Sequence, residues 1–163
     1  MHYDILTSDL IQRAAQLARS LGHSYVGSAH LLLVMAREPG AAGQTLRLLG
    51  MDPDLTEAMA RLLYGMGTPE LPLPQGLTGE SRALLRVAAR EAKFLGSREI
   101  TPQHLLLAMA RRENSDAYEL LKLNGISTDE LFTHAVDYLH WEQGAPVRGK
   151  KEAVTTKLLE QFS

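Results

Sequence analysis

The sequence HLLLVMAR at residues 30–37 returns as HLLLAMAR at residues 104–111, with one change in eight positions and a spacing of 74 residues. Other matches follow in the same order, so chance is a poor explanation. The matching pairs are Ala14-Ala15 and Ala88-Ala89, Leu21-Gly22 and Leu95-Gly96, Val26 and Ile100, and, after a slip of one residue, residues 46–51 and 121–126. The chain is therefore predicted to contain two copies of one supersecondary unit.

Each copy has the apolar periodicity of about four helices. In the first copy, apolar residues recur at helical spacing over residues 10–21, and Gly22 provides the stop. Ser28 is the expected N-cap of the second helix, and Asp52 is the expected N-cap of the fourth. The expected helix starts and stops of the second copy are Thr78, Gly96, Thr101-Pro102, Gly125 and a capping box at residues 127–130, with a last helix reaching Gln143.

The composition favours helices over strands. Apolar residues make up 45% of the 163 residues but aromatic residues only 6%, so Leu, Ala and Met, which are good helix formers, carry the apolar content. Met35 and Met109 lie inside the repeated apolar runs and are expected in the core. We therefore predict an all-α fold of about eight helices, in which two four-helix units pack as one pseudo-two-fold domain.

A segment rich in proline and glycine separates the two copies. Residues 65–79 hold three prolines and four glycines, which is typical of an extended connector. The predicted organisation is a first repeat at residues 1–63, a connector at 64–77, a second repeat at 78–143 and a linker at 144–163.

Composition and charge exclude several classes of function. The formal net charge is −2, which argues against a nucleic-acid partner, and the absence of cysteine excludes disulfides, thiolate zinc sites and cysteine nucleophiles. The chain has no leader-like start and no apolar run long enough to span a membrane, so we expect a cytoplasmic protein. Residues 144–151, GAPVRGKK, come close to a phosphate-binding loop, but the preceding segment is helical in pattern and Lys151 replaces the required Ser or Thr.

The repeated histidines His30 and His104 could suggest a metal or catalytic pair. The residues before them are Ala29 and Gln103 rather than carboxylates, so no further ligand is at hand. A histidine near a helix start, bonded to a neighbouring backbone group, explains the recurrence better. We therefore predict no catalytic residue, no metal ligand and no cofactor-binding residue in this chain.

The stretch LGHSYVGSAHLLL at residues 21–33, present in two tandem copies, resembles the Clp repeat in the N-terminal domain of ClpC/ClpA-type AAA+ unfoldases. The resemblance implies a domain that sits on an ATP-driven ring and binds adaptor proteins and unfolded or tagged protein substrates for a Clp protease. ATP and magnesium are then expected only in ATPase modules absent from this chain. Residues 157–162, KLLEQF, resemble the lead-in to the first such module, and the isolated domain is expected to be monomeric.

The resemblance also suggests partner-binding positions. ClpC-type members recognise phosphoarginine with a Thr near the start of each repeat and a Glu before each repeated His. The matching positions here are Asp4 and Ala29 in the first copy and Thr78 and Gln103 in the second. Only Thr78 keeps the pattern, so we predict weak or no phosphoarginine binding.

Three other functions remain as alternatives. The chain could be a stand-alone Clp-like adaptor or regulatory protein without an ATPase. It could be an enzyme that uses His30, His104 or the pair Glu130 and His134, or a helix-turn-helix DNA-binding protein, which its charge disfavours.

Overall fold

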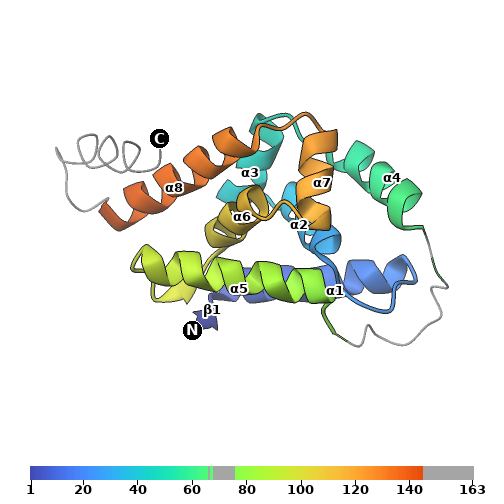
Figure 1. The fold of residues 1–163 in the computed structure, drawn as a ribbon, viewed down its shortest axis with the longest axis horizontal. Coiled ribbons are helices and arrows are strands. Elements are labelled where there is room, and N and C mark those ends of the chain that lie inside the picture. The colour runs from blue at the N-terminus through green and yellow to red at the C-terminus, as the bar shows by residue number, and fades with distance from the viewer. Residues whose placement is uncertain (66, 68–75, 145–163) are drawn as a thin grey trace.

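The structure, a computed structural model, describes residues 1–65, 67 and 76–144. These residues form eight α-helices and two strands of two residues each (Figure 1). In chain order the elements are β1 (His2–Tyr3), α1 (Ile5–Ser20), α2 (Ser28–Arg37), α3 (Ala41–Leu48), α4 (Pro53–Tyr64), α5 (Gly79–Phe94), β2 (Glu99–Ile100), α6 (Pro102–Arg111), α7 (Asp116–Leu123) and α8 (Thr128–Gly144). The predicted all-α fold of eight helices is confirmed.

The two copies repeat the same helix lengths. Helices α1 and α5 each have 16 residues, α2 and α6 have 10, and α3 and α7 have 8. The fourth helices differ, because α4 has 12 residues and α8 has 17. Part of the predicted connector, residues 66 and 68–75, lies outside the described residues. So do residues 145–163 of the predicted linker, which include all of GAPVRGKK except Gly144.

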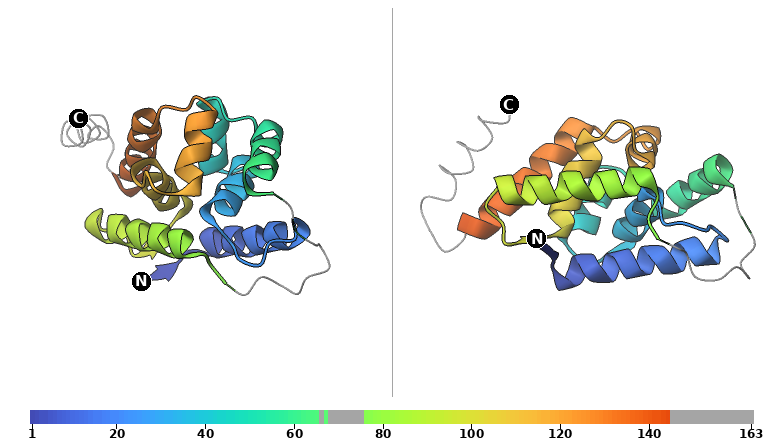
Figure 2. Two further views of the ribbon diagram at one scale, coloured as in Figure 1. Left: turned by 45° about the vertical axis from the view of Figure 1, so that its right-hand side comes forward. Right: turned by 60° about the horizontal axis from the view of Figure 1, so that its bottom comes forward.

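The repeated segments α2 and α6 form the centre of the molecule. Leu31, Leu32, Leu105 and Leu106 are 0% exposed, as expected for helices that are apolar on nearly every side. Helices α1 and α5 lie along one side of them, and α3, α7 and α8 lie on the opposite side (Figures 1 and 2). The two methionines of the repeat, Met35 and Met109, are fully buried in this core, as predicted.

Each repeat reaches across to the other through a short parallel backbone pairing. Strand β1 pairs with β2, with Tyr3 opposite Ile100. At the positions related to these by the repeat, Leu77 forms a parallel bridge with Val26. The backbone N–H of Asp4 donates to Ile100 O at 2.9 Å, and that of Thr78 donates to Val26 O at 2.9 Å. Helical periodicity could not predict these strands, since two residues are too few to show an alternating pattern.

One predicted helix start is wrong. Gly27, not Ser28, is the N-cap of α2. The hydroxyl of Ser28 donates to the carboxylate of Glu80 and accepts the backbone N–H of Ala117 at 2.9 Å, so it joins three helices instead of capping its own. The N-caps predicted at Asp52 and Thr78 are confirmed by bonds from Leu55 N at 3.1 Å and Ser81 N at 3.2 Å.

Candidate functional site

The two repeated histidines hold the starts of the two central helices. The backbone N–H of Gly27 donates to His30 Nδ1, and that of Thr101 donates to His104 Nδ1, each at 2.9 Å. These bonds match the expectation of a histidine bound to neighbouring backbone. Burial lowers the pKa of both imidazoles to about 4, so both rings are neutral at physiological pH.

In the first repeat the histidine continues into a chain of hydrogen bonds. Because His30 Nδ1 accepts the hydrogen bond from Gly27, Nε2 of the neutral ring carries the hydrogen and donates to His23 Nδ1 at 2.7 Å. His23 Nε2 then donates to the backbone carbonyl of Gly65 at 2.9 Å. The chain ties the start of α2 to the end of α4. In the second repeat, His104 Nε2 is buried and has no hydrogen-bond partner among the described residues.

The structure brings predicted partner-binding positions of different repeats together. Thr78, from the second copy, lines the same pocket as Ala29, from the first. Asp4, from the first copy, lies close enough to His104 of the second copy for its charge to raise the pKa of that imidazole, against the larger lowering by burial. Residues of different copies come close to each other here because β1 and the segment before α5 each cross to the other repeat.

These positions differ in accessibility. Asp4 and Thr78 are half-buried helix caps, and Asp4 accepts the backbone N–H of Thr7 at 2.8 Å. Ala29 and Gln103 are each 4% exposed, so neither offers a free surface for a partner. The side-chain oxygen of Gln103 is buried without a hydrogen-bond partner among the described residues.

Glu80 joins three helix starts beside Thr78. Its carboxylate accepts the backbone N–H groups of Ser28 and Asp116, both at 2.8 Å, and the hydroxyl of Thr78 at 2.9 Å. The hydroxyl of Ser28 is a further donor. The N-termini of α2 and α7 both favour a negative charge at this point. Burial alone would raise the pKa of Glu80, but these hydrogen bonds outweigh it and hold the pKa below its usual value.

Two more acidic groups lie next to Glu80. Burial, with the charges of Glu80 and Glu119, raises the pKa of Asp116 to about 6. Glu119 accepts a hydrogen bond from the hydroxyl of Tyr64 at 3.2 Å. Burial and the charges of Asp116 and Glu119 raise the pKa of Tyr64 well above its ordinary value. The carboxylates of Glu80, Asp116 and Glu119 therefore make this region acidic.

A pocket of about 170 Å³ opens at this acidic region. Its walls come from both repeats: the loop after α1, the starts of α2 and α7, the end of α4 and the residue before α5. The lining residues are Leu21, His23, Tyr25, Gly27, Ala29, His30, Leu33, Ala60, Tyr64, Thr78 and Asp116. We call this the helix-start pocket.

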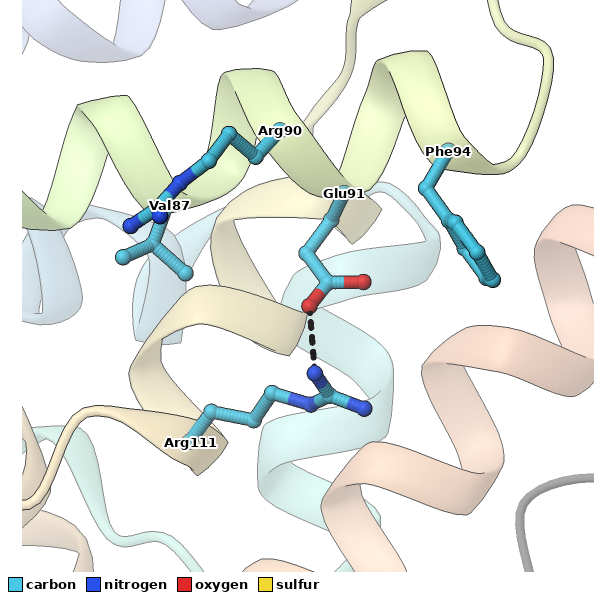
Figure 3. A pocket seen from close by; sticks show the side chains of 5 residues that line it. All are labelled: Val87, Arg90, Glu91, Phe94 and Arg111. Carbon is cyan, nitrogen blue, oxygen red and sulfur yellow. Dashed lines mark ion pairs between the residues drawn. The ribbon is translucent and has the colours of Figure 1, made fainter.

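A second, larger groove of about 420 Å³ lies on α5 and α6 (Figure 3). Val87, Arg90 and Phe94 line it from α5, and Phe94 is 75% exposed. At its base, Arg111 on α6 forms an ion pair with Glu91 at 2.8 Å and lies over the ring of Phe132, 4.5 Å from its centre.

Sequence reasoning missed Glu80 and Asp116. Their counterparts in the first repeat are Leu6 and Ala41, so neither belongs to the repeated pattern that drew attention to the histidines. A comparison of the repeats for positions that are acidic in one copy and apolar in the other would have found them.

Neither a metal site nor a membrane span is found in the part of the chain that the structure describes. Within residues 1–65, 67 and 76–144, no group of three or more His, Asp or Glu side chains is placed to hold a metal ion. None of the described helices combines the length and apolar character that crossing a bilayer requires.

The sequence profile of the Clp repeat (R) N-terminal domain matches residues 6–134. The chain belongs to this family. It is 27% identical over 157 residues to the chloroplastic chaperone protein ClpC1 of Oryza sativa, covering 94% of this chain and 17% of the relative. It is 26% identical over 152 residues to the negative regulator of genetic competence ClpC/MecB of Bacillus subtilis, covering 92% and 19%. The chain thus spans less than a fifth of these relatives.

The fold is also that of a Clp N-terminal domain. The N-terminal domain of the chaperone ClpD from Arabidopsis thaliana superposes with a TM-score of 0.66, covering 85% of this chain and 97% of the other. The sequence identity is 19%, so this likeness concerns the fold alone.

Proposed function

We propose that this chain is the adaptor- and substrate-recognition domain of a Clp-family ATP-dependent protein unfoldase and has no catalytic activity of its own. The observation that carries the proposal is that the family match covers both repeats, while the helix-start pocket is built jointly by them. A jointly built pocket exists only when the duplicated domain is folded as one unit. Such a domain presents a binding surface without needing chemistry of its own.

The proposal also concerns the full-length protein to which this chain would belong. ATP and magnesium bind in ATPase modules outside this chain, and the Clp protease is a partner of the assembled ring. The isolated domain is a cytoplasmic monomer. Several copies on one ring would raise the effective concentration of binding sites, so weak binding by each copy is sufficient.

Competition in a degradation reaction tests the proposal. The reaction contains the cognate Clp unfoldase, its protease, an adaptor and an adaptor-dependent substrate, and the isolated chain is added in excess. A recognition domain binds the adaptor or substrate, so degradation slows while the ATPase rate of the ring is unchanged. If excess chain leaves adaptor-dependent and adaptor-free degradation equally unaffected, the recognition function is wrong.

The alternative is a stand-alone adaptor or regulatory protein of the same fold. It predicts a different result in the same reaction, because a stand-alone adaptor would itself bind the ring. The added chain would then increase degradation of its own substrates or change the ATPase rate.

A further inference from the structure

We propose that the outer face of α5 binds a short acidic segment of a partner polypeptide, with an apolar side chain of that segment seated in the α5–α6 groove. The inference rests on the recognition function proposed above, because it specifies the chemistry of one partner. We call the cations on this face of α5 the basic stripe: Arg82, Arg86, Arg90 and Lys93.

The basic stripe is a continuous exposed row on one helix. Its members follow one another at intervals of three or four residues, which places them on the same side of α5, and all of them are exposed. From Arg82 to Lys93 the row covers about three helical turns, or roughly 17 Å along the axis. Because the whole chain has a formal net charge of −2, the stripe is a local concentration of positive charge in an acidic protein.

The stripe has no acidic partner in the part of the protein that the structure describes. None of the ion pairs between described residues includes one of its cations. Glu91, an acid on the same helix, is 7% exposed and is paired with Arg111 instead. Like charges four residues apart on a helix repel each other, so Arg86 has an unfavourable neighbour on each side, at Arg82 and Arg90. An acidic ligand would relieve this repulsion.

The sequence outside the described residues is a poor match for the stripe. Residues 145–163 contain four cations and two acids, so their net charge has the same sign as that of the stripe. Residues 66 and 68–75 contain a single acid, Glu70. An occupant with several carboxylates is therefore expected from another polypeptide.

The first repeat shows that the fold does not need these charges. At the positions related by the spacing of 74 residues, α1 has uncharged side chains in place of the arginines of the stripe: Ser8, Gln12 and Gln16. Helix α1 has the same length of 16 residues as α5. Phe94, which is 75% exposed, likewise has the polar Ser20 as its counterpart. Since neutral polar residues suit this face of the unit, the second copy carries its cations and its exposed ring for another purpose.

The α5–α6 groove adds an apolar contact beside the stripe. Val87 and Phe94 lie seven residues apart, and Figure 3 shows both side chains on the same side of α5. Arg90 lines the groove and also belongs to the stripe, so the two surfaces are continuous. The groove volume of about 420 Å³ is ample for an apolar side chain, since whole small molecules bind in roughly 300–1,000 Å³. Covering the exposed ring of Phe94 would contribute to binding.

A polypeptide suits this surface better than a nucleic acid. Carboxylates stand beyond both ends of the stripe: Glu80 and Asp116 at the start of α5, and the exposed Glu99 after its end. A nucleic acid gains affinity from many phosphate contacts, so its backbone would run past the stripe and meet these acids. A short acidic segment can end where the stripe ends.

Nuclear magnetic resonance titration of the isotope-labelled full chain tests the inference. The probe is a capped alanine-rich peptide with glutamates one helical turn apart and a leucine beside them, and the matched probe has glutamine in place of every glutamate. Arg86→Gln with Arg90→Gln introduces the residues that α1 has at these positions, so the fold should be kept. Arg19→Gln with Lys122→Gln, at exposed cations of α1 and α7, makes the same change in net charge and is the control.

We expect the glutamate peptide to shift amide signals along α5 in a saturable titration that weakens as salt is added. Arg86→Gln with Arg90→Gln should weaken binding about fivefold or more, and the control double variant should bind like the parent chain. Phe94→Ser, which introduces the counterpart from α1, should weaken binding about threefold or more. The inference is overturned if the glutamine peptide binds equally well, if the shifts lie away from α5, or if the stripe variant binds like the parent.

The same variants identify other occupants. A single-stranded oligonucleotide and vesicles of anionic lipid are titrated at the same ionic strength. If either binds more tightly than the glutamate peptide and loses its binding in Arg86→Gln with Arg90→Gln, the stripe recognises that class of partner and the inference is wrong. Sedimentation tests a second copy of the chain as the occupant. Dimers of the parent chain that this double variant does not form would also overturn the inference.

The degradation assay separates this inference from the proposed function. If the parent chain and the stripe variant Arg86→Gln with Arg90→Gln inhibit adaptor-dependent degradation equally, the recognition function stands and the inference about the stripe fails. If the parent chain inhibits and the stripe variant does so only at higher concentration, both proposals are supported. If neither chain inhibits, the recognition function fails, whatever the peptide titration shows.

Discussion

The hydroxyl of Thr78 donates a hydrogen bond to Oε2 of Glu80 at 2.9 Å. Thr78 is the one position that keeps the family pattern for phosphoarginine recognition, yet its hydroxyl already faces a carboxylate of the same chain. A phosphate at this point would be repelled by the negative charge of Glu80. The nearby backbone N–H groups of Ser28 and Asp116 already donate to Glu80. The arrangement strengthens the prediction that phosphoarginine binds weakly or not at all.

Free phosphoarginine is therefore expected to leave the amide signals of both repeats unchanged at micromolar concentration. The measurement is a nuclear magnetic resonance titration of the chain, followed at the residues around Thr78 and Gln103. Saturable shifts in both repeats in that concentration range would show that the prediction is wrong.

Removing the Glu80 carboxylate should both destabilise the protein and create a response to phosphate. Glu80→Ala leaves the N–H groups of Ser28 and Asp116 without their acceptor, which costs roughly 2 kcal/mol or more of unfolding free energy. Inorganic phosphate can take the place of the lost carboxylate at these two helix starts, so it should raise the melting temperature of Glu80→Ala more than that of the parent. Glu113→Ala, at an exposed acid in the loop before α7, is the control and should show neither effect.

Stability should fall as the protein is acidified from about pH 6.5 to about pH 4. Burial lowers the pKa of His30 and His104 to about 4, so across this window the unfolded chain takes up protons that the folded protein does not. Glu80, whose pKa is held below its usual value, acts in the same direction at the acidic end. Asp116 acts oppositely, because its pKa is raised to about 6 and its contribution to stability is lost as the pH rises through that value. The two histidines outweigh it.

Variants separate these contributions. His104→Gln should be less stable than the parent near neutral pH but should lose less stability on acidification, because one group with a lowered pKa is gone. Asp116→Asn should show a steeper acid loss, because the opposing group is gone. Urea denaturation followed by the fluorescence of Trp141, the one tryptophan of the chain, measures both. If the unfolding free energy of all three proteins changes equally with pH, the pKa shifts assigned to His104 and Asp116 would be contradicted.

The fold could be predicted from the sequence because its determinants are local and repeated. The octapeptide 30–37 and its copy mark the two central helices, and Asp52 and Thr78 mark helix starts through contacts within three residues of themselves. The candidate site could not be predicted in the same way. Ser28 and Glu80 are 52 residues apart, and Thr78 and Ala29 line one pocket only because the segment before α5 crosses to the other repeat. Such contacts depend on packing between the copies, which periodicity does not record.

A glycine in α3 permits a close approach between helices. A Cβ atom at Gly43 would lie 2.0 Å from the carbonyl oxygen of Glu38 and 2.7 Å from that of Met35, and both are backbone atoms that cannot move cheaply. Gly43→Ala is therefore expected to destabilise the protein by about 1–3 kcal/mol, although alanine is the better helix former. Gly79→Ala is the matched control, since a Cβ there meets only the end of the Arg82 side chain at 3.8 Å, and it should be neutral or slightly stabilising. Equal effects of the two variants in urea denaturation would refute this account.

The ion pair between Glu91 and Arg111 should stabilise the folded protein mainly because Glu91 is buried. Glu91 is 7% exposed, so Arg111→Met leaves a buried carboxylate without its partner and is expected to cost about 1–3 kcal/mol (Figure 3). The first repeat has Leu17 at the position of Glu91, which shows that an apolar side chain suits this part of the unit. The double variant Glu91→Leu with Arg111→Met should therefore recover most of the lost stability.

Arg37, the counterpart of Arg111 in the first repeat, supplies the control. Its partner Asp54 has a side chain that is 88% exposed, and its more distant partner Glu57, at 3.7 Å, also pairs with Arg61. Arg37→Met should therefore change the unfolding free energy little. A double-mutant cycle in urea measures the coupling between Glu91 and Arg111. If the double variant is less stable than Arg111→Met alone, the carboxylate contributes stability independently of its arginine, and the α5–α6 groove needs an acid at position 91 for another reason.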